Sequence, residues 1–185
     1  MKILFLGPRD TPACLYNNRD GVVSVNHSID MAFVNKLDSD IIISYNYPHI
    51  IPADIGKAYY GRAVNLHISY LPWNRGADPN FWSFMDDTPK GVTIHYIDEG
   101  IDTGDIIAQK LVRLSAKDTL RTNYEKLHKA MLDLFEKTWP SISSGYYLKK
   151  KKLKGKGSYH NSRDKDKYWA VMPKGWDTKC ADLMQ

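Results

Sequence analysis

The chain has 185 residues, of which 43% are hydrophobic and 12% aromatic, so it can bury a full core in a single domain of ordinary size. Its longest apolar runs are far shorter than the roughly 20 residues that a membrane-spanning helix needs. The formal charge of +5 is local, since six lysines lie between Lys149 and Lys156 and the rest of the chain is nearly neutral. These features exclude a broad basic face for nucleic acid. The lysine run is interpreted as a solvated surface, with an anion or phosphate contact as the alternative.

The ends of the chain carry two further indications. The amino terminus passes from Lys2 directly into an apolar run that ends at Gly7, without the small-residue cleavage site of a signal peptide, which favours the cytoplasm. Cys14 and Cys180 lie near opposite ends and lack the spacing of metal ligands. We expect both to be free thiols.

The first elements along the chain follow a strand, helix, strand pattern. Residues 2–7 and 40–44 are short apolar runs, typical of strands buried on both faces of a parallel sheet. Between them, residues 27–37 predict a helix with Ser28 as its cap, because apolar side chains recur at helical spacing at Ile29, Phe33 and Leu37.

Two more strands and a short helix are predicted in the middle of the chain. Residues 52–60 favour a short helix with Pro52 near its start, and residues 62–67 form a third strand. Residues 91–98 alternate apolar and polar side chains, which predicts a strand with one wetter face. The pattern is typical of an α/β fold, a Rossmann-like open and mostly parallel sheet flanked by helices.

The carboxyl-terminal part begins with a long amphipathic helix. Its apolar positions recur every three or four residues from Asp118, the expected cap, to Trp139, and Pro140 is expected to end it. The aromatic and basic residues beyond predict a short hairpin-like extension. We therefore divide the chain into a domain at residues 1–140 and an extension at residues 141–185.

A group of polar residues follows the predicted strands. Asn65 and His67 are two positions apart on a strand, so they share one face, and they lie at its carboxyl end, where ligands collect in open α/β sheets. His95 lies on another strand, and a loop with four carboxylates follows it: Asp98, Glu99, Asp102 and Asp105. Alone, Asn65 and His67 also suit a purely structural role. Together with the carboxylates they predict a site that handles protons.

The segment from Asn65 to Gln109, "NLHISYLPWNRGADP…GVTIHYIDEGIDTGDIIAQ", resembles the catalytic segment of the folate-dependent formyltransferases. The resemblance is dense over about 45 residues and implies that residues 1–140 are a formyltransferase catalytic domain. It implies 10-formyltetrahydrofolate as cofactor and tetrahydrofolate as product, with no metal. A zinc site at His67, His95 and Asp102 is an alternative without familiar ligand spacing.

The resemblance also implies roles for individual residues. The catalytic trio is Asn65, His67 and Asp102. The folate is expected against two loops, Tyr45–Pro52 and Asp98–Asp102, with contacts from Tyr45, Tyr47, His49, Ile50, Ile51, His95, Ile97, Asp98 and Gly100. Substrate contacts are expected from Arg9, Trp73, Arg75, Gly76, Tyr159 and His160.

The chemistry of formyl transfer suits these residue types. Transfer to a primary amine passes through a tetrahedral intermediate with an oxyanion, which needs a positioned hydrogen-bond donor, and Asn65 and His67 are expected to supply it. The amine loses a proton and the folate nitrogen gains one, which Asp102 with a bound water and His67 can mediate.

Among the members of this family, the chain most resembles the sugar N-formyltransferases, which formylate amino-dideoxy sugars on nucleotide carriers in surface polysaccharide (O-antigen, lipopolysaccharide) synthesis. Residues Gly155 to Asp164, "GKGSYHNSRD", resemble the aromatic and histidine-bearing segment that follows the catalytic core in those proteins. The glycinamide ribonucleotide enzyme has a Gly-Ser-Asn phosphate grip where this chain has "GPRD", and few residues follow the long helix for the tRNA-binding domain of methionyl-tRNA formyltransferase. The amino-terminal half is expected to be shortened by one strand and helix. A methionyl-tRNA formyltransferase-like enzyme, a formyltetrahydrofolate hydrolase and a non-catalytic binding module remain alternatives.

A homodimer is the expected assembly. Beyond Pro140, the apolar residues Tyr146, Tyr147, Leu148 and Leu153 are more than an isolated two-stranded ribbon can bury on itself. A second copy of the chain is the expected partner, because a two-fold interface is self-complementary. The alternative is that the ribbon packs on its own core.

Overall fold

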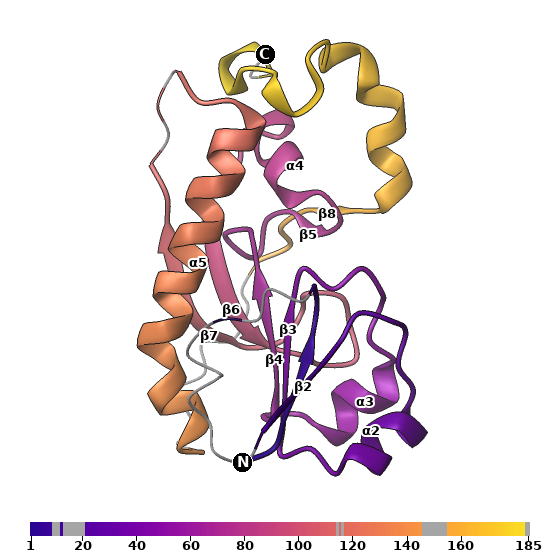
Figure 1. Ribbon diagram of the computed structural model, residues 1–185. Helices are drawn as coiled ribbons and strands as arrows, with labels where there is room; N and C mark the ends of the chain where they lie inside the picture. Colours follow the sequence, from indigo (N-terminus) through magenta and orange to yellow (C-terminus); the bar gives the residue numbers. More distant parts are fainter. Residues whose placement is uncertain (9–11, 13–20, 114, 116, 146–154, 184–185) are drawn as a thin grey trace. The chain divides into compact units, whose positions relative to one another are not determined.

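The computed structural model describes residues 1–8, 12, 21–113, 115, 117–145 and 155–183 (Figure 1). They form two compact units, each built from three stretches of chain. Unit 1 contains Met1–His67, Ile94–Ala108 and Leu134–Leu153, and unit 2 contains Ile68–Thr93, Gln109–Asp133 and Lys154–Gln185. The division of the chain at residue 140 stays a prediction.

The sheet has six strands in the order β2-β1-β3-β4-β6-β7. Its first four strands are parallel to their neighbours: β1 (Ile3–Leu6), β2 (Val22–Val25), β3 (Ile41–Tyr45) and β4 (Ala63–His67). The predicted fold class, an open and mostly parallel sheet with flanking helices, is confirmed. The edge strand β2, "VVSV", was not predicted, although its valines are typical of a strand. It lies in the stretch that we expected to be shortened.

The last two strands, β6 (Gly91–Tyr96) and β7 (Ile106–Leu111), run antiparallel. Tyr96 N–H donates to the carbonyl of Asp105 at one end of the pair, and Val112 N–H donates to the carbonyl of Lys90 at the other. Every residue of β6 is buried, so the prediction of a wetter face on this strand is wrong. The polar side chains of β6 are paired inside the protein: Thr93 Oγ1 accepts from Leu71 N–H and donates to the carbonyl of Ser69.

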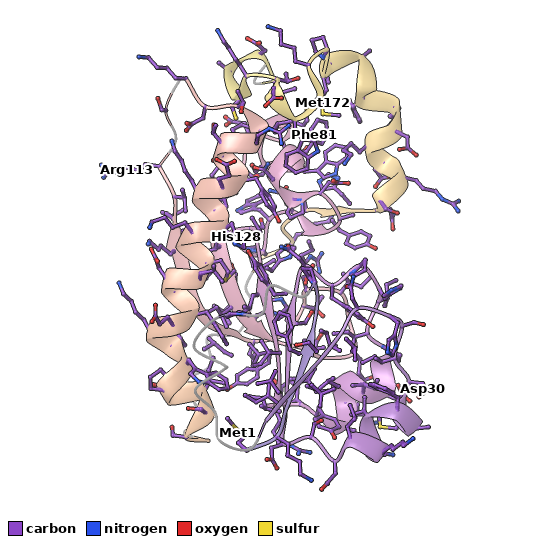
Figure 2. All side chains as sticks on the ribbon, in the orientation of Figure 1. Met1, Asp30, Phe81, Arg113, His128 and Met172 are labelled. Atoms are coloured by element: carbon purple, nitrogen blue, oxygen red, sulfur yellow. The ribbon has the colours of Figure 1, made fainter. Side chains whose placement is uncertain are left out.

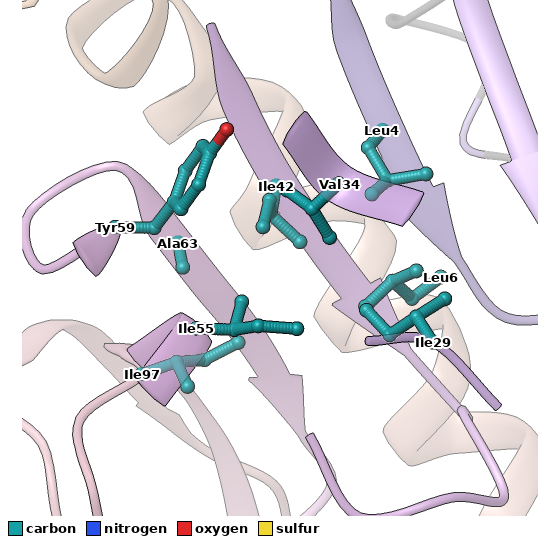
Figure 3. Close-up of a cluster of buried hydrophobic side chains, with 9 residues drawn as sticks. All are labelled: Leu4, Leu6, Ile29, Val34, Ile42, Ile55, Tyr59, Ala63 and Ile97. Atoms are coloured by element: carbon teal, nitrogen blue, oxygen red, sulfur yellow. The ribbon is translucent and has the colours of Figure 1, made fainter. Parts of the chain in front are cut away.

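Two short helices of unit 1, α2 (Met31–Leu37) and α3 (Ala53–Ala58), pack on one face of the sheet. Figure 3 shows their side chains Val34 and Ile55 in one cluster with alternate residues of the strands, among them Leu4, Leu6 and Ile42. Both helices lie where they were predicted. The cap of α2 is Asp30 and not Ser28, because Asp30 Oδ1 accepts from Phe33 N–H at 2.8 Å.

The core of unit 2 joins α4 (Pro79–Met85) to the carboxyl-terminal segment. Phe81 and Met172 both belong to this cluster and are labelled in Figure 2; its other members are Trp82, Phe84, Leu120, Cys180 and Leu183. Burial, with Asp118 as a further cause, raises the pKa of the Cys180 thiol to about 11. This free thiol is therefore unreactive at neutral pH.

The carboxyl-terminal extension differs from the expected hairpin where it is described. The ribbon residues 146–154 lie outside the described residues. After them, β8 (Tyr159–His160) pairs in parallel with β5 (Arg75–Gly76), and three 3-10 helices follow: η1 (Ser162–Val171), η2 (Gly175–Asp177) and η3 (Cys180–Asp182). A strand of two residues and three short helices carry too little periodicity for sequence analysis to find.

The long helix α5 spans Leu120–Ser143 and supplies residues to both units. Thr119 caps it instead of Asp118: Thr122 N–H donates to Thr119 Oγ1 at 3.2 Å, and Thr119 N–H donates to Thr122 Oγ1 at 2.9 Å. The helix continues past Pro140, where it was expected to end. A proline in the last turn removes only one hydrogen bond of the helix, and Ser144 N–H closes the next turn on the carbonyl of Pro140. No helix in the described part of the chain is long and apolar enough to cross a membrane.

Candidate active site

Strands β4 and β6 bring an amide and two imidazoles together in unit 1. Asn65 and His67 alternate with Leu66 on β4, so both lie on the same face of this strand, as predicted. His67 is buried, and His95 on β6 is 1% exposed. The rings of His67 and His95 meet edge to face, with 6.3 Å between their centroids. The strands therefore place three polar side chains side by side within the protein.

The loop between β6 and β7 adds the carboxylate of Asp102. Asp98 shapes this loop, since its Oδ1 accepts from Gly100 N–H at 3.0 Å and from the Thr103 hydroxyl at 2.6 Å. Asp102 itself has a φ of 53°, in the left-handed region that few residues other than glycine adopt. Gly104 then passes so close to β6 that a Cβ atom there would lie 1.9 Å from the carbonyl oxygen of Tyr96. These contacts preform the loop that carries Asp102.

The four side chains are in direct contact. Asn65 Nδ2 donates to Asp102 Oδ1 at 3.0 Å and lies 3.3 Å from His95 Nε2. The carboxylate of Asp102 lies between the rings: its Oδ1 is 3.3 Å from His95 Nε2, and its Oδ2 is 3.5 Å from His67 Nδ1. The predicted trio of Asn65, His67 and Asp102 is therefore brought together, with His95 as a fourth member.

The hydrogen bonds fix the orientation of two of these groups. His95 Nδ1 lies 2.8 Å from the carbonyl of Tyr96, and a carbonyl only accepts, so Nδ1 carries the hydrogen in the neutral ring. His95 Nε2 then accepts from Asn65. The two hydrogens of the Asn65 amide point at Asp102 and His95, so its oxygen points away from this pair.

The loop after β3, predicted to contact folate, is tied to the loop before α2. The Tyr47 hydroxyl donates to the carbonyl of His27 at 2.6 Å, and His49 Nε2 lies 3.3 Å from the carbonyl of Asn26. Burial, opposed by a backbone hydrogen bond, raises the pKa of Tyr47. Ile50 at the tip is 76% exposed, whereas Tyr45 is buried in the core. Tyr47 and His49 therefore hold the loop, a role that we did not predict from the sequence.

Other residues of the expected folate site have side chains that pack in the core or bond within their own loop. Ile97 is buried in the core of unit 1, and Ile51 packs against that core. The carboxylate of Asp98 is used within its own loop, where it receives the N–H of Gly100. The contacts themselves stay predictions.

The expected substrate residues, apart from Arg9, which lies outside the described residues, gather in unit 2. Trp73 is 38% exposed and Tyr159 is 42% exposed. Arg75 and Gly76 form β5, which pairs with Tyr159 and His160 on β8. Trp82, by contrast, is buried, and its ring stacks on His160 at 3.9 Å. The partner of His160 was not predicted: it is Asp86, whose carboxylate lies 2.8 Å from His160 Nε2.

The alternative of a zinc site at His67, His95 and Asp102 depends on how these side chains are arranged. Among the residues that the structure describes, no group of three or more His, Cys, Asp or Glu side chains is arranged to hold a metal ion. In particular, His95 Nε2 faces both the Asn65 amide and Asp102, an arrangement of hydrogen-bond donors and acceptors. The printed contacts of this group are thus hydrogen bonds and ion pairs among side chains.

Comparisons with known proteins agree on one family. A family model described as formyl transferase matches residues 23–138. The crystal structure of the formyltransferase PseJ from Anoxybacillus kamchatkensis, in complex with UDP-4,6-dideoxy-4-formamido-L-AltNAc and tetrahydrofolate, is similar over 100% of this chain and 98% of that chain, with 47% identity and a TM-score of 0.94. A 4-N formyltransferase from Francisella tularensis shares 26% identity and a TM-score of 0.79, over 90% of this chain and 78% of that chain.

A curated relative covers a smaller region. The bifunctional polymyxin resistance protein ArnA of Wigglesworthia glossinidia brevipalpis is 35% identical over 120 residues. These residues make up 64% of this chain and 18% of that protein. The similarity thus concerns one part of a much longer protein.

Proposed function

Because the chain belongs to the formyltransferase family, we propose that it is a folate-dependent N-formyltransferase whose acceptor is the primary amine of a nucleotide-linked amino-dideoxy sugar. The observation that carries the chemistry is the contact of Asp102 with Asn65 and the two imidazoles. The choice of acceptor is supported by the similarity to PseJ, whose structure contains a UDP-linked formamido sugar. We place the reaction in the cytoplasm and in surface polysaccharide synthesis, as the sequence suggested.

The described loops fit a folate. Ile50 and Ile101, which are 76% and 37% exposed, offer apolar surface on the two loops where the pterin was expected. The loop of Asp98 is preformed by its internal hydrogen bonds, so its backbone groups are already in place. Backbone groups of Tyr45–Pro52 and Asp98–Asp102 would hold the pterin. When bound, 10-formyltetrahydrofolate supplies the formyl group.

The residues of the site divide the chemical work. When the amine attacks the formyl carbon, the carbonyl oxygen gains negative charge and needs a donor. The hydrogens of Asn65 are engaged by Asp102 and His95, so we assign this donation to His67, whose charged form is stabilised by the carboxylate of Asp102 3.5 Å away. Asn65 holds Asp102 in place. The oxygen of its amide remains to accept an N–H of the incoming amine.

The proton balance involves Asp102. The amine nitrogen loses one proton as its bond to the formyl carbon forms, and the folate nitrogen gains one as its bond breaks. Asp102, directly or through a water, accepts the first proton and returns it for the second, so no net proton is consumed. His95 Nε2 lies 3.3 Å from Asp102 Oδ1 and can hold the proton between the two events.

The proposed function is tested by measuring formyl transfer directly. The protein is incubated with 10-formyltetrahydrofolate and a panel of UDP-linked and dTDP-linked amino-dideoxy sugars, and the products are analysed by mass spectrometry. We expect one sugar to gain a single formyl group while tetrahydrofolate forms in equal amount. Free formate without any amine would indicate a hydrolase, and formylation of methionyl-tRNA would indicate the other family member. If neither transfer nor hydrolysis occurs while tetrahydrofolate binds, the protein is a binding module.

A further inference from the structure

The strand β8 is held firmly on the loop that precedes α4 within unit 2. Ser158 N–H donates to the carbonyl of Pro72 at 3.3 Å, and the carbonyl of Ser158 accepts from Arg75 N–H at 3.0 Å. The hydroxyl of Ser158 accepts from Asn74 N–H at 2.8 Å, and Asn74 is fully buried. At Gly157 a Cβ atom would lie 1.9 Å from the carbonyl oxygen of Pro72, so the two segments touch. The backbone of β8 is therefore fixed before any ligand binds.

The two side chains of β8 have different surroundings. His160 stacks on Trp82 with an angle of 3° between the rings, and its Nε2 lies 2.8 Å from the carboxylate of Asp86. The next residue back, Tyr159, alternates to the other side of the strand and is 42% exposed. His160 thus anchors the strand, and Tyr159 is the residue that it presents to solvent.

The ring of Tyr159 is supported from below by Gly76. A Cβ atom on Gly76 would lie 2.9 Å and 3.3 Å from Cε2 and Cδ2 of this ring, so the ring packs against a bare backbone. Gly76 also has a φ of +86°, a conformation that other residues rarely adopt. The Tyr159 hydroxyl donates to Asn161 Oδ1 at 3.0 Å, which fixes the orientation of the ring. The result is a flat aromatic surface on a rigid support.

We propose that the exposed ring of Tyr159 is the surface on which the base of the nucleotide-linked sugar stacks. The inference rests on the proposed function and adds a specific contact to it. A fixed ring loses little conformational entropy when a base stacks on it, and such stacking tolerates any base. Arg75 is paired with Tyr159 in the register of β5 and β8, and its Nη2 donates to the carbonyl of Lys156 at 3.4 Å; we assign its positive charge to the phosphates of the same ligand. An aromatic ring for the base and a guanidinium for the phosphates match the two ends of a nucleoside diphosphate.

The experiment measures binding of UDP, of pyrophosphate and of tetrahydrofolate by calorimetry, without catalysis. The variants are Tyr159→Leu, Tyr159→Phe and, as a matched control, Trp176→Leu, which removes another exposed aromatic side chain of unit 2. We expect Tyr159→Leu to weaken UDP binding by about tenfold to a hundredfold, the contribution of stacking one base. Trp176→Leu is expected to bind UDP like the wild type, and Tyr159→Phe, which keeps the ring but lacks the hydrogen bond to Asn161, is expected to bind UDP more tightly than Tyr159→Leu. Binding of pyrophosphate, which has no base, is expected to be unchanged in Tyr159→Leu.

A second readout detects stacking directly. In the wild type and in Tyr159→Phe, a nuclear Overhauser effect is expected between the uracil H6 proton and the ring at position 159, and it is absent in Tyr159→Leu. If Tyr159→Leu binds UDP as tightly as the wild type, or loses pyrophosphate affinity to the same extent, the stacking role is wrong while the proposed function stands. If the wild type binds tetrahydrofolate but no UDP, both the nucleotide-linked acceptor and this inference are wrong.

Discussion

The Asn65 amide shows how single hydrogen bonds assign roles that residue types alone leave open. From the sequence, both Asn65 and His67 were expected to donate to the carbonyl oxygen. In the structure the Asn65 nitrogen faces Asp102 and His95, because its oxygen in that place would meet the Asp102 carboxylate. His67 is left as the donor, with the same carboxylate 3.5 Å behind it. The carboxylate of Asp102 therefore contacts all three of the other side chains in the site.

We expect Asp102→Asn to lower kcat by about a hundredfold or more, because it removes both the proton acceptor and the negative charge that stabilises a protonated imidazole. The matched control is Asp105→Asn in the same loop. The carboxylate of Asp105 accepts a hydrogen bond from the Tyr60 hydroxyl at 3.0 Å. The control is expected to keep kcat within about threefold, as for a substitution outside the chemistry. Steady-state kinetics, with circular dichroism to confirm folding, provides the measurement. Equal loss in both variants would show that the loop tolerates no change and would remove the argument for Asp102.

At the scale of elements, glycines allow the loops of unit 1 to approach the sheet. A Cβ atom on Gly56 of α3 would lie 2.2 Å from the carbonyl oxygen of Asp98, and one on Gly104 would lie 1.9 Å from that of Tyr96. Backbone atoms cannot move aside as a flexible side chain can. The loop that carries Asp102 can consequently take this position only because Gly56 and Gly104 have no Cβ atom.

Gly104→Ala is expected to lower both kcat and the free energy of unfolding, because the loop must move away from β6. An overpacked site of this kind costs about 1 to 3 kcal/mol. Gly175→Ala is the matched control: a Cβ atom there meets nothing within 4 Å, and only its φ of +53° is unfavourable. It should cost about 1 kcal/mol of stability and leave kcat unchanged. Chemical denaturation and kinetics of the two variants separate a displaced loop from a general loss of stability; an unchanged kcat in Gly104→Ala would contradict the argument.

The start of α5 is joined to the carboxyl-terminal segment by Asp118. Its carboxylate accepts from Lys126 Nζ at 2.6 Å and 2.7 Å and from Ser115 N–H at 2.7 Å, while its carbonyl accepts from Cys180 N–H. Burial alone would raise the pKa of Asp118, but the hydrogen bonds from Lys126 and Ser115 outweigh it and hold the pKa below its usual value of 3.8. The ionised form is thus favoured in the folded state.

This lowered pKa predicts the pH dependence of stability. The contribution of Asp118 is fully present above its unfolded pKa and is lost as the pH falls through the lower folded pKa, that is, below about 4. Asp118→Asn should therefore reduce the free energy of unfolding by about 1 to 3 kcal/mol at neutral pH. The difference in the free energy of unfolding between Asp118→Asn and the wild type should shrink as the solution is acidified. Asp177→Asn, which breaks an exposed pair with Arg121, is the control and should change stability little at any pH. A difference for Asp118→Asn that is constant with pH would contradict the linkage.

At the scale of the whole molecule, the sequence predicted what regular patterns encode. Buried apolar runs indicated β1 and β3, and the alternation around Asn65 placed two polar side chains on one face of β4. The contacts of His160 with Trp82 and Asp86 could not be predicted, because they join residues more than 70 positions apart through a strand of only two residues. Likewise, the orientation of the Asn65 amide depends on distances that no spacing in the sequence contains.

The homodimer predicted from Tyr146, Tyr147, Leu148 and Leu153 needs a test adapted to the fold. These four residues lie outside the described residues. Truncation after Ser144, the simplest test, would also remove Met172, Cys180 and Leu183 from the core of unit 2 and would unfold that unit. Substitutions within the segment avoid this problem.

We expect light scattering to give twice the chain mass for the wild type at micromolar concentration. The combined substitutions Tyr146→Ser, Tyr147→Ser and Leu148→Ser should give a single chain mass, because they remove the apolar surface that a two-fold interface would bury. Leu111→Ser is the control, since Leu111 is a large apolar side chain that is 60% exposed and belongs to a different segment. It should remain dimeric. A wild type with the mass of one chain would contradict the dimer, and a triple variant that remains dimeric would place the interface elsewhere on the molecule.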